Sequence, residues 1–186
     1  MDDVAIRIFA PATVANVAVG FDILGFAIHG PGDEIIVKKG TQPGLVITQI
    51  TGTGKKQLPL EAVKNTAGVA GLQLMEFTNN AAVAIEMEIH KKMPFGSGLG
   101  SSAASAAAGV MAVNEWLGSP LSKMEILRFA VAGEEIADGA WHADNVAPSL
   151  LGGITFIRDN ATLDVHALPV PDELYAAVVY PDVEIP

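Results

Sequence analysis

The clearest pattern of apolar and polar residues along the chain lies between residues 83 and 90, where the two kinds alternate. Val83, Ile85, Met87 and Ile89 occupy the odd positions, and mostly polar residues occupy the even ones. Such alternation is typical of a strand with one buried face. Shorter apolar runs bounded by turn residues predict further strands. These runs are residues 4–9 (ending at Pro11), 33–38, 45–51, 154–157, 165–168 and 174–180.

Three segments have a helical pattern instead. Residues 64–77 carry a loose apolar face, and the alanine-rich residues 103–117 end at Gly118-Ser119-Pro120. Ser122, with Glu125 three positions later, forms a capping box that predicts a helix running to about residue 138. Strands and helices do not alternate regularly along the chain. The order therefore predicts a mixed α+β fold and not a βαβ repeat.

Composition narrows the class of protein. The chain has 186 residues, of which 50% are hydrophobic, with no cysteine and a net charge of −10. The apolar half excludes a disordered acidic chain, and the lack of cysteine excludes disulfides, thiolate metal sites and a thiol nucleophile. The acidic balance disfavours a nucleic-acid partner. The start of the chain lacks a basic signal segment, and no apolar run reaches the roughly 20 residues of a membrane span. These features predict a soluble, cytoplasmic protein without a membrane partner.

A glycine-rich loop is the strongest candidate for chemistry. Gly96, Gly98 and Gly100 follow a predicted strand and precede a predicted helix, with Ser101 and Ser102 next in sequence. Glycines let successive backbone N–H groups point into one hollow, and a helix N-terminus adds partial positive charge, so an anion such as phosphate is favoured. The spacing fits neither a Walker A loop, nor a dinucleotide fingerprint, nor a hydrolase elbow. Ordinary turn chemistry is the alternative on the residues alone.

The loop and its neighbours resemble a known family. Residues 94–104, PFGSGLGSSAA, look like the phosphate loop of the GHMP kinases, which include galactokinases and mevalonate kinases. Residues 10–25, APATVANVAVGFDILG, and residues 142–148, HADNVAP, with Gly152-Gly153 after them, resemble signatures of the homoserine kinase branch. Val14 and Ala18-Val19 depart from the usual pattern of the first signature, which bears on the exact substrate pocket.

The resemblance implies a fold like domain 2 of ribosomal protein S5. It also implies that residues 1–186 are the N-terminal, ATP-binding domain of a kinase whose C-terminal domain is missing, so that this chain alone would have little activity. The expected reaction is ATP-dependent phosphorylation of the hydroxyl of L-homoserine, a step of threonine biosynthesis. Another GHMP kinase activity, or a non-catalytic nucleotide-binding or assembly module, is the alternative. An apolar face left by a missing domain would also favour a homodimer.

The same resemblance implies a role for individual residues. Those expected around ATP are Asn65, Pro94, Gly96, Ser97, Gly98, Leu99, Gly100, Ser101 and Ser102. Ser102 and Glu134 would hold Mg²⁺, with Glu135 as the rival if the helical register is shifted by one. Asn65 has a plain alternative as a polar residue at a helix N-terminus.

The substrate would be bound by Asn16, Asp22, His142 and Asp144. On the residues alone, Asn16 and Asp22 are ordinary turn residues and His142 is a surface histidine. Catalysis is assigned to Ser102, Glu134, Asp144 and Asn145, with positioning expected to matter more than a strong base. Phosphoryl transfer has a loose transition state, which depends mainly on alignment and charge neutralisation.

Overall fold

One long strand organises the sheet. The computed structural model describes residues 4–54, 57–94 and 96–179, and in it β2 (Leu24–Lys39) pairs antiparallel with β1 (Ala5–Val14), β4 (Ala84–His90) and β5 (Ile154–Asp159). The sheet order is β3-β4-β2-β5-β6, with β1 paired to β2 off this path. Strand β3 (Gly44–Thr51) runs parallel to β4, whereas β6 (Asp164–Leu168) is antiparallel to β5. The predicted mixed α+β fold is confirmed.

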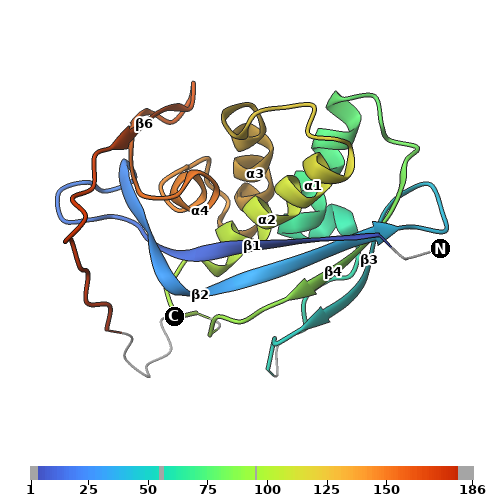
Figure 1. Cartoon of the computed structure of the whole chain (residues 1–186), viewed down its shortest axis with the longest axis horizontal. Helices are drawn as coiled ribbons and strands as arrows, with labels where there is room; N and C mark the ends of the chain where they lie inside the picture. Colours follow the sequence, from blue (N-terminus) through green and yellow to red (C-terminus); the bar gives the residue numbers. More distant parts are fainter. Residues whose placement is uncertain (1–3, 55–56, 95, 180–186) are drawn as a thin grey trace.

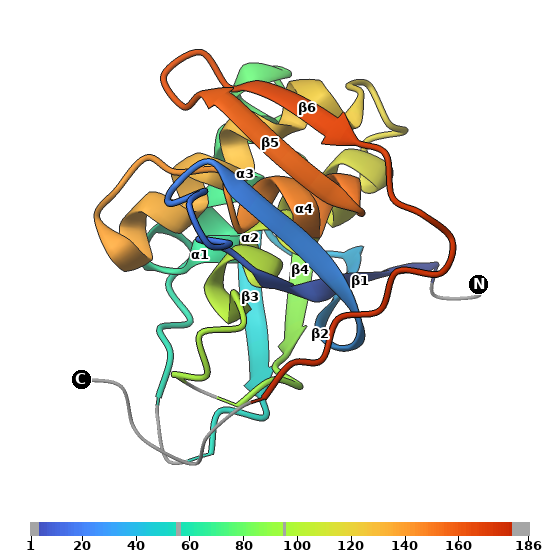
Figure 2. The same ribbon diagram turned by 90° about the vertical axis from the view of Figure 1, so that its left-hand side faces the viewer.

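The helices lie together on one face of the sheet (Figures 1 and 2). They are α1 (Thr66–Phe77), α2 (Ser101–Trp116), α3 (Lys123–Asp138) and the short α4 (Val146–Leu151), with a 3₁₀ turn at Ala62–Lys64 before α1. Helix α2 is central, since it contacts β1, β2 and the three other helices. Its small residues permit this position: a Cβ on Gly109 would lie 2.7 Å from the carbonyl oxygen of Ala67 in α1.

The core forms between the sheet and these helices. Ile85, Met87 and Ile89 of β4 are buried, as their alternation predicts, and Ile35 and Val37 of β2 lie beside them. The capping box of α3 is also confirmed, because Ser122 Oγ accepts from the N–H of Glu125 and the Glu125 carboxylate accepts from the N–H of Ser122 at 2.8 Å.

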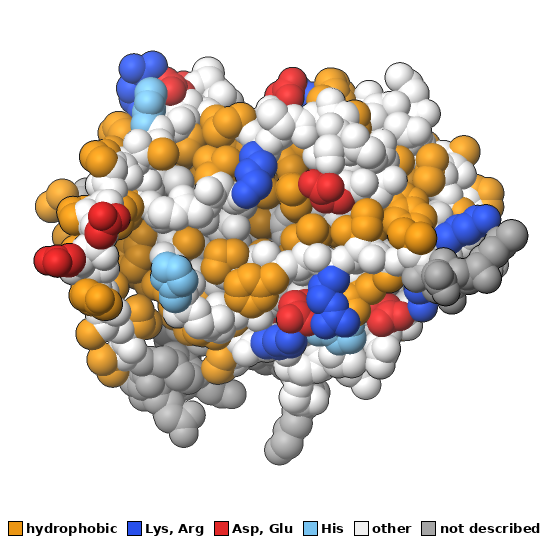
Figure 3. All heavy atoms as spheres, viewed as in Figure 1, with side chains coloured by type: hydrophobic (Ala, Val, Ile, Leu, Met, Phe, Trp, Pro, Cys, Tyr) orange, Lys and Arg blue, Asp and Glu red, His pale blue; other side chains and the backbone are white. Residues whose placement is uncertain are grey.

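The intervening polar positions of the central strands carry interspersed charges. Lys38 of β2 pairs with Glu88 of β4 at 2.8 Å, and Lys92 pairs with Glu34 at 2.7 Å. Acidic and basic side chains also lie side by side on the surface shown in Figure 3. None of the described helices has the length and continuous apolarity that a membrane span requires.

Strands β1 and β2 extend well beyond their predicted bounds. Strand β1 does not end at Pro11 but continues to Val14, with a register shift between Pro11 and Thr13. Because the only partner of β1 among the described strands is β2, the missing N–H of Pro11 is tolerated. Strand β2 begins at Leu24, nine residues before the predicted start at Asp33, because its first residues pair with β5 although glycine and proline follow them.

Two further differences concern the second half of the chain. Helix α4 was not predicted, since its six residues are too few to show a helical period. The predicted strand at 174–180 is wrong over residues 174–179, which form no strand and are exposed, with Tyr175 at 89% and Val179 at 86%. Tyr180 lies outside the described residues.

Candidate functional site

The glycine-rich segment forms the N-terminal boundary of α2. We call residues 96–102 the phosphate loop, after the phosphate-binding role that the sequence analysis expects of them. Gly96, Gly98 and Gly100 have φ angles of 68°, 68° and 65°, in the left-handed region where glycine is favoured. A Cβ on Gly96 or Gly98 would meet open space, whereas a Cβ on Gly100 would lie 2.2 Å from Thr13 Oγ1. The first two glycines therefore keep the loop surface bare, and the third allows close approach of β1.

This loop and the start of α2 line a cavity of about 490 Å³. Helix α2 begins at Ser101 without a side-chain cap, so its first N–H groups have no partner within the helix and carry the positive end of its dipole. Ser97 Oγ is shielded from solvent and has no hydrogen-bond partner among the described residues. A buried polar atom normally has a hydrogen-bond partner, and an anion bound in this cavity would supply one for the Ser97 hydroxyl.

A hydroxyl and a carboxylate lie together at the N-terminus of α2. Ser102 Oγ donates to Glu134 Oε1 at 2.6 Å, and both residues line the cavity. Glu134 is only 7% exposed, whereas its neighbour Glu135 points outward. The helical register thus favours Glu134 over Glu135 for a role in this cavity.

These two oxygen donors suit Mg²⁺. Magnesium is typically held by one or two protein carboxylates, with phosphate and water oxygens completing its octahedron. In the part of the chain that the structure describes, no three histidine, aspartate or glutamate side chains gather as a metal cluster. A hydroxyl–carboxylate pair beside an anion site fits a metal that arrives with phosphate.

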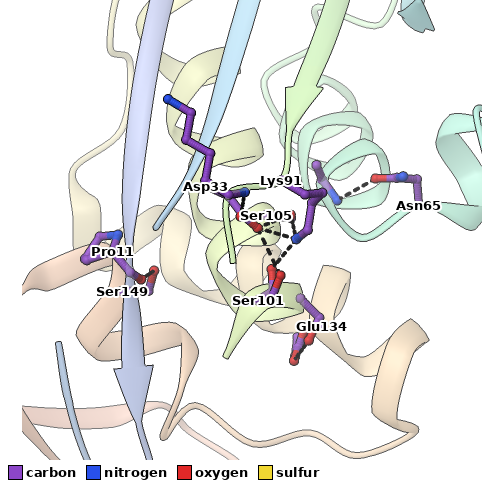
Figure 4. Close-up of polar contacts among 11 residues, drawn as sticks. Pro11, Asp33, Asn65, Lys91, Ser101, Ser105, Glu134 and Ser149 are labelled. Carbon is purple, nitrogen blue, oxygen red and sulfur yellow. Dashed lines mark hydrogen bonds and ion pairs between the residues drawn. The ribbon is translucent and has the colours of Figure 1, made fainter. Parts of the chain in front are cut away.

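A buried ion pair underlies the phosphate loop (Figure 4). Lys91 Nζ, just after β4, contacts Asp33 Oδ2 of β2 and donates to Ser105 Oγ and the carbonyl oxygen of Ser101 of α2, both at 2.6 Å. The side chains of Lys91 and Asp33 are 3% and 0% exposed. Burial lowers the pKa of Lys91, while the Asp33 charge opposes this shift. The network joins β2 and the residue that follows β4 to the N-terminal part of α2, and the sequence analysis did not identify it.

Three other residues predicted to contact the nucleotide differ in their position relative to the cavity. Asn65 caps α1, accepting from the N–H groups of Ala67 and Gly68, and it also lines the cavity, so its plain structural role is compatible with the predicted one. The buried Leu99 lines the cavity as well. Pro94 is exposed and does not belong to the lining.

The residues predicted to bind substrate lie in two loops. Asn16 and Asp22 belong to the β1–β2 loop (residues 15–23), where Asn16 Oδ1 accepts from the N–H of Asp22 at 2.8 Å. His142 and Asp144 belong to the α3–α4 loop (residues 139–145). His142 Nδ1 lies 3.7 Å from Asp22 Oδ1, so the structure brings the two loops together.

Asn145 connects this end to the phosphate loop. Its Oδ1 accepts from Thr13 Oγ1 at 2.8 Å, and it lines the cavity beside Gly100. The N–H of Thr13 in turn donates to the carbonyl oxygen of Leu99 at 3.1 Å. The candidate nucleotide and substrate ends are therefore adjacent, with Asn145 between them.

The ionised carboxylate of Asp144 lowers the stability of the folded state. Burial raises its pKa; the nearby Asp22 adds to this shift, and His142 and backbone N–H groups oppose it. Because the folded state then holds this proton more tightly than the unfolded state, ionisation destabilises the fold above the unfolded pKa near 3.8. We expect Asp144→Asn to raise the midpoint of thermal unfolding at pH 7. The gain should shrink as the pH falls toward the unfolded pKa, and a lower midpoint at pH 7 would contradict this account.

Comparisons with known proteins agree with the geometry. Residues 60–153 match the model of the GHMP kinases N terminal domain. A homoserine kinase of Chlorobium phaeobacteroides is 46% identical over 97% of this chain, and one of Xanthomonas campestris is 41% identical over 95%. The crystal structure of homoserine kinase from Cytophaga hutchinsonii superposes on the whole chain with a TM-score of 0.92 and 50% identity.

The relatives are longer than this chain, which matches only part of each of them. The chain spans 59% and 53% of the two curated relatives and 58% of the solved homoserine kinase. A mevalonate kinase of Methanococcus jannaschii has a TM-score of 0.70 at 19% identity, which shows that the fold is shared. The family match covers half of the chain and includes the phosphate loop, Ser102 and Glu134, and the chain accordingly belongs to the GHMP kinase family.

Proposed function

We propose that this chain is the nucleotide-binding, N-terminal domain of an enzyme that transfers the γ-phosphoryl group of ATP to the hydroxyl of L-homoserine. The observation that carries the proposal is the phosphate loop, whose bare glycines and uncapped helix open into a cavity beside Ser102 and Glu134. The choice of homoserine is supported by the relatives of that name, which align with 95–97% of this chain. Their greater length supports a C-terminal domain in the complete protein.

The phosphate end acts through the backbone. The N–H groups of the phosphate loop and the first turn of α2 would bind the ATP phosphates, with Ser97 Oγ as a further donor. Asn65 belongs to the lining of the same cavity but comes from the N-terminus of α1 and not from the phosphate loop, which favours a contact with the base or sugar. Fixed donors aimed at a developing charge stabilise a transition state without reorganising.

Ser102 and Glu134 would hold Mg²⁺ at this end. A bound magnesium neutralises phosphate charge and aligns the transferring group. The buried Glu134 carboxylate has a fixed orientation because it accepts from Ser102. Both residues come from helices that pack on each other, α2 and α3, which favours a fixed position of the pair.

The substrate end would bind homoserine through opposite charges. Asp22 and Asp144 suit the ammonium group, and Asn16, His142 and Asn145 supply polar contacts. The raised pKa of Asp144 leaves it able to take a proton from the hydroxyl, but alignment is its main role, as phosphoryl transfer requires little base strength. A cytoplasmic location and a homodimer are further expectations from the sequence.

The proposal is tested by measuring turnover with the complete protein that contains this chain. Purified protein with ATP and Mg²⁺ should phosphorylate L-homoserine with a kcat/KM at least about 10²-fold above that for mevalonate or galactose, since a site built for polar groups rejects analogues that leave them unpaired. The 186-residue chain assayed beside it should bind ATP but turn over little. Preference for mevalonate or galactose would contradict the substrate, and failure of both proteins to bind ATP would contradict the kinase.

A further inference from the structure

The side chain of Asn160, in the turn between β5 and β6, bonds to both loops of the substrate end. Its Nδ2 donates to the carbonyl oxygen of Asp22 at 3.0 Å, and its Oδ1 accepts from the N–H of Ala143 at 3.0 Å. The β5–β6 hairpin and the β1–β2 loop lie at the same end of the molecule (Figures 1 and 2). One amide thus joins segments that are more than a hundred residues apart in sequence.

The β1–β2 loop needs such an external tie. Asn16, Ala18 and Asp22 have φ angles of 55°, 51° and 60°, a conformation that costs energy for residues other than glycine. The loop also buries little apolar surface, because Val19 and Phe21 are largely exposed. The bonds within the loop are local ones, such as that from the N–H of Asp22 to Asn16 Oδ1, and they do not fix Asp22 relative to the α3–α4 loop.

Asn160 holds the α3–α4 loop at the residue between His142 and Asp144. The N–H that Asn160 accepts from belongs to the peptide between His142 and Ala143, and Asp144 is the next residue. Ala143 itself is fully buried, so its peptide cannot turn to water when the bond is lost. Fixing this peptide orients the residues on both of its sides.

We propose that Asn160 is a positioning residue that sets the spacing between Asp22 and the His142–Asp144 pair, and so determines binding of the phosphoryl acceptor. This inference rests on the proposed function for the identity of the acceptor. An amide fits both contacts, because it offers a donor and an acceptor from one planar group. An aspartate could keep the bond from Ala143 but would place a carboxylate against the Asp22 carbonyl.

The turn itself does not depend on the Asn160 side chain. Trp141 Nε1 donates to the backbone oxygen of Asn160 at 2.9 Å, and the Asp159 carboxylate accepts from the N–H of Ala161 and the hydroxyl of Thr162. These three bonds remain in Asn160→Ala and Asn160→Asp. Asn80→Ala is the matched control, since Asn80 is also half-buried in a turn and donates to one carbonyl, that of Thr78, outside this region.

Amide hydrogen exchange on the 186-residue chain tests the positioning without an assay of activity. Asn160→Ala should speed exchange by about 5- to 10-fold in both loops, as loss of a hydrogen bond worth about 1 kcal/mol implies, and leave α2 unchanged. Asn160→Asp should loosen the β1–β2 loop and spare the α3–α4 loop. Equal loosening of both loops by Asn160→Asp, no change in either variant, or the same pattern in Asn80→Ala would overturn the inference.

Kinetics of the complete protein test the consequence. Asn160→Ala should raise the KM for homoserine about tenfold or more, as expected from a small misplacement of binding groups, with the KM for ATP within about twofold. An equal rise in both KM values, or none, would overturn the role in acceptor binding while leaving the kinase activity of the wild type intact. If the wild type does not phosphorylate homoserine but the exchange pattern is as expected, the positioning role of Asn160 is supported and the proposed substrate is wrong.

Discussion

Replacing Glu134 by glutamine should lower the kcat of the complete protein by about 10²–10³-fold, a loss typical of removing one preorganised electrostatic group from a site. Glutamine preserves the size of the side chain and can still accept from Ser102, so the fold should be retained. The negative charge that would hold Mg²⁺ is lost. We therefore expect a much higher Mg²⁺ concentration for half-maximal rate, measured by titrating the metal at saturating ATP and homoserine.

Glu135→Gln is the matched control, because it makes the same chemical change one residue along α3. Its side chain is exposed, and no shift of its kcat or metal dependence is expected beyond about twofold. Equal losses in the two variants would show that overall charge is responsible, and an unchanged kcat in Glu134→Gln would remove Glu134 from the metal site.

Lys91→Met should produce the largest loss of stability. It leaves the Asp33 carboxylate, which is fully buried, without its counter-charge, and breaking such a pair costs about 3–5 kcal/mol. For a chain of this size that corresponds to a fall in Tm of about 6–20 °C. Thermal unfolding followed by circular dichroism measures it directly.

The neighbouring Lys92→Met provides the contrast. Lys92 is half-exposed and pairs with Glu34 at 2.7 Å, and such surface pairs contribute about 0–1 kcal/mol. The double variant Asp33→Leu/Lys91→Met should recover part of the stability lost in Lys91→Met, because the uncompensated charge is gone. Similar Tm values for the two single lysine variants would refute the importance of burial here.

Local patterns in the sequence predicted the elements whose signals are local. The alternation in β4 and the capping box of α3 each involve residues within one turn or strand, and both are found in the structure. The start of β2 was missed because Gly25, Gly30 and Pro31 indicate a turn, whereas residues 24–26 pair with β5 and residues 26 and 27 pair with β1, so the strand begins before these turn residues. Apolar residues 174–179 indicated a strand, but no neighbouring strand pairs with them in the described chain.

The candidate site divides in the same way. The glycine-rich loop at the start of α2 was predictable since its residues lie in one short segment, and the structure adds that Glu134 and not Glu135 lines the cavity beside it, while binding of phosphate there stays a prediction. The Asp33–Lys91 pair and the Asn160 contacts were not predictable, because their partners are far apart along the chain and each residue alone is an ordinary charged or turn residue.

The pairing of β2 with β5 has a consequence for the order in which the molecule is made. Residues 24–26 cannot pair with β5 until residues 154–156 have been synthesised, whereas residues 34–39 can pair with β4 once residue 90 has been made. We therefore expect that, during synthesis, the glycine-rich loop at the start of α2 can form before Asn160 makes its bonds to the β1–β2 and α3–α4 loops. A nascent chain stalled before residue 154 would contain α1, α2 and α3 but would lack β5, β6 and the bonds that Asn160 makes to the β1–β2 and α3–α4 loops.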